Sequence, residues 1–190
     1  MLLDKREKAG FEKAMKKGKK YESRIQDKIK KVSSGEVFFN VNISNYGEFD
    51  AIVADYPLLS FIEIKAYRTN LVWRRARAAA NKLRKLCLKV TEDPVAHYHY
   101  LSWIPRPRTY DDAHVYLTNL QLLFKKLSMD VVDGWKFRMI LIVPDKSYET
   151  VLLALKGKPN SNNRPPINLF EGDGPTLIVI PEKRIKEVFG

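Results

Sequence analysis

Residues 49–67, FDAIVADYPLLSFIEIKAY, predict two apolar β-strands joined by a turn at Pro57. Three charged residues, Asp50, Glu63 and Lys65, interrupt these apolar runs where a buried strand normally carries valine or leucine. Because side chains alternate across a strand, Glu63 and Lys65 are expected to share one face. A sheet that accepts two carboxylates and an amine at these positions needs a reason beyond packing.

The turn determines which residues of the two strands face each other. If the hairpin is centred between Tyr56 and Pro57, Asp50 lies directly opposite Glu63. Cross-strand neighbours of this kind have Cβ atoms about 4.5–5.5 Å apart. We therefore expect both carboxylates and Lys65 to converge on one patch. A slip of one residue would instead place the two carboxylates on opposite faces.

Two carboxylates this close repel each other, and partial burial makes it harder to keep both ionised. A divalent cation such as Mg²⁺ removes the conflict, because it prefers carboxylate, water and phosphate oxygens as ligands. Such an ion polarises a phosphodiester and activates a bound water, and Lys65 could position that water or neutralise charge on the phosphate. The pattern favours metal-assisted phosphodiester hydrolysis. The simpler alternative is a Glu63–Lys65 pair on the solvated face of an edge strand.

A further carboxylate, Glu22, falls on the apolar stripe of a helix predicted over residues 4–32, in line with Ile25. A carboxylate there is costly unless it has a partner. Gly18, one turn earlier, would allow a ligand or another backbone to approach closely. Alternatively, Glu22 lies at the edge of the stripe and pairs with Lys19 or another lysine. The sequence leaves both interpretations open.

The rest of the chain predicts a single α/β domain over residues 1–190, with a central mixed sheet flanked by helices. The core is expected at about 5–90 and 136–190, with a helical insertion at about 91–130. Residues 148–155 fit either a short helix or a strand. Strands are predicted at 36–43, 48–54, 59–65, 136–143 and 176–180, and further helices at 70–90, 111–129 and 181–189.

The chain is strongly basic, with 34 Lys and Arg against 22 Asp and Glu and a formal net charge of +12. This excess favours a polyanionic partner, nucleic acid first and an anionic membrane surface second. Cys87 is the only cysteine, which excludes an internal disulfide, and no Cys/His cluster suggests a zinc or iron–sulfur site. No apolar run approaches the length of a membrane span, and no secretory signal is recognised. We therefore expect a soluble, intracellular protein without a membrane partner.

The predicted helix after the charged hairpin is a candidate surface for nucleic acid. Residues 65–89 contain nine basic and no acidic residues, whereas a merely solvated face usually mixes both signs. The N-terminal lysines are a second candidate surface, and they could equally form a basic arm. The residues chosen as DNA contacts are Arg68, Arg74, Arg75, Arg77, Lys19 and Lys20.

The order of these motifs resembles that of the PD-(D/E)XK nuclease superfamily. The chain has GKKYE ending at Glu22, then GEFD ending at Asp50, then EIK at residues 63–65. The G-x-x-x-E opening after a basic N-terminus is similar to that of archaeal Holliday-junction resolvases, and similar compact nucleases occur in archaeal viruses. The resemblance covers roughly residues 18–90 and, more weakly, the final strands. One departure is that Phe49, rather than proline, precedes Asp50.

The resemblance implies a restriction-endonuclease-like α-β-β-β-α-β core and a divalent-metal-dependent DNA nuclease. The expected activity is that of an endonuclease, with branched or junction DNA among its candidate substrates, in the host cytoplasm if the source is a virus. The implied ligands of Mg²⁺ or Mn²⁺ are Asp50, Glu63 and the Ile64 carbonyl, with Glu22 completing the metal shell. Lys65 would serve the attacking water, and a homodimer would suit paired cuts on two strands.

Two other classes of function compete with an enzyme. The first is a non-catalytic nucleic-acid-binding protein that keeps the nuclease fold. The second is a basic structural or membrane-surface protein, for which no clustering of Glu22, Asp50, Glu63 and Lys65 is expected. A structure in which these four side chains lie apart would therefore favour the last class, and a structure in which they cluster would argue against it.

Overall fold

A computed structural model describes residues 5–43, 47–66, 72–91, 119–130, 135–156 and 176–190 of the chain. The first half contains α1 (Lys5–Val32), β1 (Glu36–Ile43), β2 (Gly47–Asp55), β3 (Leu58–Ile64) and α2 (Val72–Thr91). The second half contains α3 (Asn119–Lys126), β4 (Lys136–Val143), the 3₁₀ turn η4 (Asp145–Ser147), α4 (Tyr148–Lys156), β5 (Thr176–Pro181), the 3₁₀ turn η5 (Glu182–Arg184) and α5 (Ile185–Phe189). Every predicted strand is confirmed, with bounds that differ by at most one residue.

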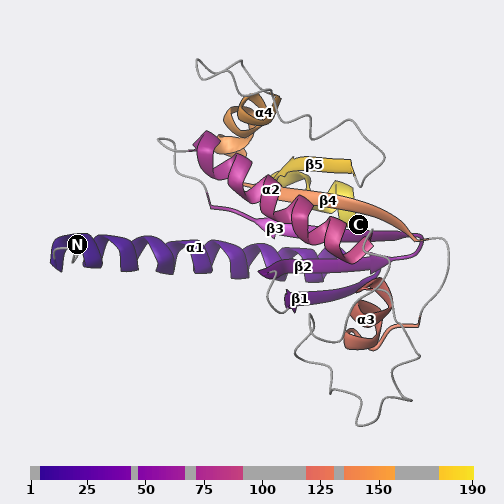
Figure 1. The fold of residues 1–190 in the computed structure, drawn as a ribbon. Helices are drawn as coiled ribbons and strands as arrows, with labels where there is room; N and C mark the ends of the chain where they lie inside the picture. The colour runs from indigo at the N-terminus through magenta and orange to yellow at the C-terminus, as the bar shows by residue number, and fades with distance from the viewer. Residues whose placement is uncertain (1–4, 44–46, 67–71, 92–118, 131–134, 157–175) are drawn as a thin grey trace, which may run out of the picture.

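The described strands form one mixed sheet in the order β1-β2-β3-β4-β5 (Figure 1). β1, β2 and β3 pair antiparallel, whereas β3, β4 and β5 pair parallel. Parallel neighbours need a crossover, and these are made through α2 and α3 and then through α4. The predicted α/β class, with a mixed sheet flanked by helices, is therefore confirmed, and β3 is the central strand.

The helices differ from their predictions in three places. The segment that fitted either a helix or a strand is helix α4. The closing helix is divided into the turn η5 and the short α5. In the insertion, the described part of the predicted helix at 111–129 is α3, while residues 92–118 lie outside the described residues.

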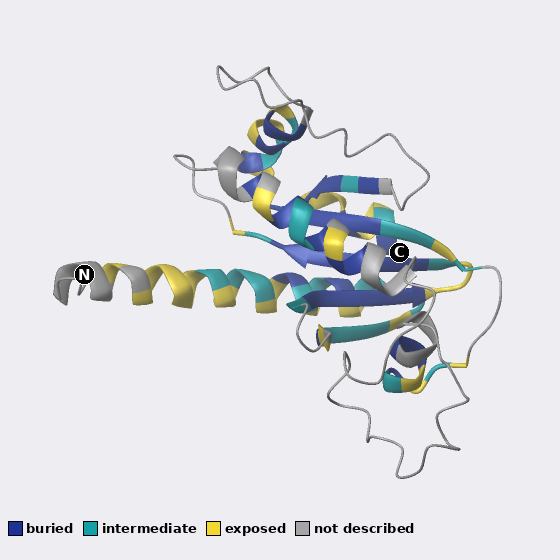
Figure 2. Cartoon of the chain, viewed as in Figure 1, coloured by how far each residue is buried: buried dark blue, intermediate teal, exposed yellow. Residues whose placement is uncertain are grey.

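Two apolar layers enclose the sheet. On one face α2, α3 and α4 pack through side chains such as Leu83, Phe124 and Val151. On the other face α1 and α5 pack through Ile25 and Phe189, among others. Strands β2, β3, β4 and β5 are largely buried, whereas the described residues of the edge strand β1 are mostly intermediate or exposed (Figure 2). Burial on both faces explains why the central strands read as almost continuous apolar runs.

Only the C-terminal half of α1 packs on the sheet. Ile25 and Ile29 are fully buried, whereas Met15 is 48% exposed and no atom outside the helix lies within 4 Å of the Cβ position of Gly18. Figure 1 shows the N-terminal half of the helix extending past the ends of the strands. Among the described side chains of α1, the apolar stripe that predicted this helix is therefore buried only in the second half.

Candidate active site

The β2–β3 hairpin has the register expected from the sequence. Ala51 pairs with Ile62, and the same register continues to the turn at Pro57. The next positions in this register are Asp50 and Glu63, where regular pairing of the two strands stops. The alternative register, which would have separated the carboxylates onto opposite faces, is excluded.

Where the regular pairing of β2 and β3 ends, the side chain of Asp50 accepts a hydrogen bond from the backbone of β3. The backbone N–H of Ile64 donates a 2.6 Å hydrogen bond to Oδ2 of Asp50. Asp50 is almost fully buried, and a carboxylate that accepts a backbone N–H makes a strong, charge-assisted hydrogen bond. The carboxylate is thus directed at the backbone of the neighbouring strand. The prediction placed Asp50 and Glu63 directly opposite each other on one face of the sheet, and the contact of Asp50 with the β3 backbone differs from this.

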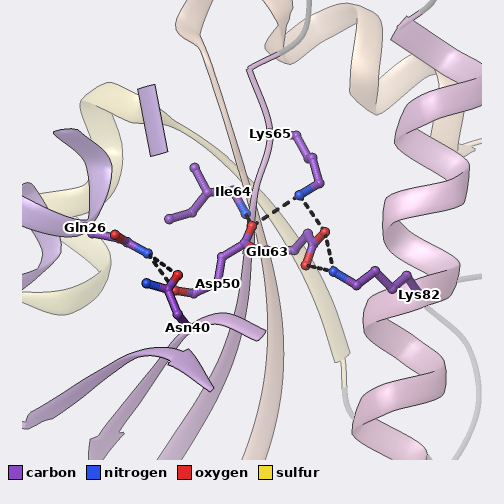
Figure 3. A network of polar contacts seen from close by, with 7 residues as sticks. All are labelled: Gln26, Asn40, Asp50, Glu63, Ile64, Lys65 and Lys82. Atoms are coloured by element: carbon purple, nitrogen blue, oxygen red, sulfur yellow. Dashed lines mark hydrogen bonds and ion pairs between the residues drawn. The ribbon is translucent and has the colours of Figure 1, made fainter. Parts of the chain in front are cut away.

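Lys65 joins the two carboxylates. Its Nζ lies 3.2 Å from Oδ2 of Asp50 and 2.6 Å from Oε1 of Glu63 (Figure 3). Glu63 is fully buried on the central strand, whereas the Lys65 side chain is 34% exposed. The predicted convergence of the three charged groups is confirmed. The alternative of a Glu63–Lys65 pair on a solvated edge strand is wrong, because Glu63 is buried and its strand is central.

Lys82 of α2 is a contact that the sequence-based prediction did not include. Its Nζ lies 3.1 Å from each carboxylate oxygen of Glu63. Lys82 was counted among the basic residues of this helix without a role of its own. Its position held a usable signal: it follows Ala79 by three residues and precedes Leu86 by four, and both are buried. Helical periodicity therefore places Lys82 near the packed side of α2.

Glu22 lies near enough to these groups for their charges to act on its carboxyl. Burial raises the pKa of its carboxyl, the charge of Asp50 raises it further, and Lys65 lowers it. In the described part of the chain no ion pair joins Glu22 to Lys19, which is exposed on the surface of α1. We use "charged cluster" for Asp50, Glu63, Lys65 and Lys82, with Glu22 adjacent. This clustering contradicts the expectation for a basic structural or membrane-surface protein.

The regular alternation of side chains between the two faces of β2 is interrupted at Asp50. Phe49 packs in the layer of α2, whereas Ala51 packs in the layer of α1. In a regular strand these residues, two apart, would share a face. The pairing of β1 with β2 is regular on both sides of Asn40 and Asp50 but omits that pair. Asn40 has a positive φ of 52°, a conformation that asparagine tolerates better than most residues.

Gln26 supports this irregular segment from α1. Its Nε2 donates to the backbone carbonyl of Asp50 at 2.9 Å and to Oδ1 of Asn40 at 3.1 Å (Figure 3). Gln26 follows Glu22 by one helical turn, so both side chains lie on the same side of α1. The amide thus satisfies a carbonyl at the break in the β1–β2 ladder. The predicted site does not include Gln26, because its contact with the Asp50 carbonyl depends on the break in the β1–β2 pairing.

The charges of the cluster determine its protonation. Burial raises the pKa of Glu63 and Asp50 raises it further, while Lys65 and Lys82 oppose this. Burial alone would lower the pKa of Lys65, but Asp50 and Glu63 outweigh burial and raise it above its usual value. Lys65 is therefore an ammonium group at neutral pH. It can donate hydrogen bonds and offset negative charge, but it cannot accept a proton.

The residues predicted to contact DNA are only partly described. Lys19 and Lys20 are exposed near the middle of α1. Arg68 lies outside the described residues. Arg74, Arg75 and Arg77 fall on α2, but their side chains are likewise outside the described part of the structure.

Among the described residues, Glu22, Asp50 and Glu63 included, no group of three or more His, Cys, Asp or Glu side chains is arranged to hold a metal ion. No helix in the same described part of the chain is long and apolar enough to cross a membrane.

Comparisons with protein-family models, with curated proteins and with solved structures found no match for this chain. The charged cluster itself therefore carries the functional argument.

Proposed function

We propose that this protein is a divalent-metal-dependent DNA nuclease that hydrolyses phosphodiester bonds, and that the charged cluster is its active site. The observation that carries the proposal is the Lys65 ammonium group held between Asp50 and Glu63, two buried carboxylates at the end of a central hairpin. The resemblance to the PD-(D/E)XK superfamily extends the proposal to a restriction-endonuclease-like core and to endonuclease activity. Branched or junction DNA is the first substrate class to test.

A purely structural role explains this cluster poorly. Removing an ion from water into a protein interior costs several kcal/mol even after relaxation, and apolar residues of similar size often serve stability equally well. Here Glu63 is fully buried and Asp50 nearly so, and both carboxylates are compensated by ammonium groups that stay partly exposed. Perturbed charged groups of this kind concentrate at functional sites.

The chemistry of the donor set fits a hard divalent cation. Asp50, Glu63 and the Ile64 carbonyl would hold Mg²⁺ or Mn²⁺, and Glu22 would complete the metal shell. All of these donors are oxygens, which Mg²⁺ and Mn²⁺ prefer, and no thiolate or imidazole takes part. When bound, such an ion polarises the phosphodiester and lowers the pKa of a coordinated water.

The chain's own residues supply orientation and charge. Asp50 is fixed through its side chain by the Ile64 N–H and through its carbonyl by Gln26. As an ammonium group, Lys65 would donate a hydrogen bond to the attacking water or to a phosphate oxygen. Fixed donors of this kind lower the barrier because they need no rearrangement when charge develops.

The net charge of +12 supports DNA as the polyanion. Lys19 and Lys20 would contact phosphates near the middle of α1, within one helical turn of Glu22. Arg68, Arg74, Arg75 and Arg77 remain the predicted contacts near α2. Cutting both strands of a duplex would require two such sites, for which a homodimer remains the prediction.

A panel of single-stranded, duplex, flap and four-way-junction DNA, incubated with Mg²⁺ or Mn²⁺, tests this function. Cleavage is expected to require the metal and to disappear in Asp50→Asn and Lys65→Ala, while both variants still bind DNA. Unchanged cleavage in either variant would refute the assignment of the site. Binding of DNA without cleavage of any substrate would instead identify a nucleic-acid-binding protein.

A further inference from the structure

The ammonium group of Lys82 donates hydrogen bonds to both oxygens of the Glu63 carboxylate. Its Nζ is equidistant, at 3.1 Å, from Oε1 and Oε2, and Lys65 also contacts Oε1 at 2.6 Å. Both oxygens of Glu63 therefore accept from ammonium groups. These three contacts use most of the lone-pair positions of the carboxylate, so a cation that binds Glu63 would compete with the two ammonium groups.

Charge balance leads to the same conclusion. The carboxylates of Asp50 and Glu63 are matched by the ammonium groups of Lys65 and Lys82, so these four groups together are neutral. A divalent cation added to this arrangement would leave positive charge in excess, even with the Glu22 carboxylate as a further ligand. Loss of one ammonium group relieves part of that excess and frees the Glu63 oxygens at the same time.

The geometry identifies Lys82 as the group that leaves. Lys65 contacts both carboxylates, and its backbone N–H is bonded to the Ile142 carbonyl at 3.0 Å, which anchors it on the sheet. Lys82 has only Glu63 as an ion-pair partner among the described residues, and its side chain is 40% exposed. A long, half-exposed lysine side chain on a helix can reach solvent by rotation about its own bonds.

We propose that Lys82 competes with the divalent cation for Glu63 and thereby sets the cation affinity of the site. When the cation binds, the Lys82 ammonium group is released from Glu63 into the solvent beside α2. This inference rests on the proposed function, because it takes Glu63 as a metal ligand. It adds a residue that the predicted site did not contain, and it assigns that residue a role distinct from the role of Lys65.

The first test measures Mn²⁺ binding by calorimetry, without DNA, in the full-length protein. Lys82→Met removes the competing charge and is expected to bind Mn²⁺ more tightly, by the order of tenfold. Lys82→Arg keeps the charge and is expected to resemble the wild type. The matched control is Lys85→Met, which removes a charge from an exposed position on the same helix and is expected to change the affinity little.

The second test uses the wild-type protein and so does not depend on how any variant folds. Amine-reactive labelling, quantified by mass spectrometry, is expected to increase at Lys82 when Mn²⁺ is added and to stay constant at Lys85. The inference is overturned if the wild type binds Mn²⁺ and Lys82→Met binds it with equal or lower affinity. It is also overturned if the labelling of Lys82 stays constant when Mn²⁺ is added. The proposed nuclease function survives both outcomes. No Mn²⁺ binding by any of these proteins would overturn both.

Discussion

Asp50 should carry a structural role that can be separated from its charge. The Ile64 N–H donates to Oδ2 of Asp50 at 2.6 Å in a buried environment. Asp50→Ala and Asp50→Asn both remove the negative charge, so their effects on Glu63 and Lys65 are matched. Only asparagine keeps an oxygen that can accept from the Ile64 N–H. The difference between the two variants therefore reports the hydrogen bond.

The size of this difference follows from the cost of a buried N–H group that lacks an acceptor. That cost is about 1–3 kcal/mol. For a chain of this length it corresponds to a melting temperature roughly 2–12 °C lower for Asp50→Ala than for Asp50→Asn. Because each variant lacks the carboxylate, both are expected to lose DNA cleavage to the same extent.

Urea-induced unfolding of the two variants, followed by circular dichroism, measures the difference directly. The midpoint should differ while the dependence of the unfolding free energy on urea stays the same, because the surface exposed on unfolding is nearly unchanged. Equal unfolding free energies of Asp50→Ala and Asp50→Asn would refute the view that this side chain replaces a strand-pairing hydrogen bond.

Three further predictions concern α1. Gln26→Leu leaves a backbone carbonyl of β2 without its donor, so unfolding measurements should show a loss of about 1 kcal/mol; cleavage should fall in kcat more than in KM, and unchanged stability and kcat would contradict a positioning role. Glu22→Gln should raise stability, because burial and Asp50 raise the pKa of Glu22 and its ionised form therefore disfavours the folded state. The gain should be largest above the raised pKa and vanish as the pH falls below the ordinary value of 4.5; exposed Glu12→Gln is the control, and an equal gain at all pH values would exclude this cause. Alanine at both Lys19 and Lys20 should weaken DNA binding and reduce the slope of log affinity against log salt by roughly 2, whereas an unchanged slope in filter-binding titrations would remove both lysines from the interface.

The strands and their register could be predicted because local signals were sufficient. Apolar runs of strand length, bounded by a turn at Tyr56 and Pro57, fixed both the strands and the alignment of β2 with β3. That alignment was enough to bring Asp50, Glu63 and Lys65 together. Partners within one hairpin are separated by few residues, so their pairing depends little on the rest of the fold.

Contacts between distant elements could not be predicted in this way. The hydrogen bonds of Gln26 depend on a break in the β1–β2 ladder and on the positive φ of Asn40, and no local pattern marks either. Lys82 resembled the other basic residues of its helix until the packing of α2 on the sheet was known. The periodicity of α1 likewise runs through the whole helix, although its described side chains are buried only in the second half.

The two carboxylates of the cluster are supported from opposite faces of the sheet, and the two supports differ in rigidity. The backbone of Asp50 is held by Gln26 of α1, close to the fully buried Ile25 and Ile29. Glu63 is contacted by Lys82, a half-exposed side chain of α2. Asp50 is therefore fixed before any ligand arrives, while the environment of Glu63 can change without unpacking the core. The proposed exchange of Lys82 for a cation needs this asymmetry, because Asp50 must hold its position while Glu63 loses its contact with Lys82.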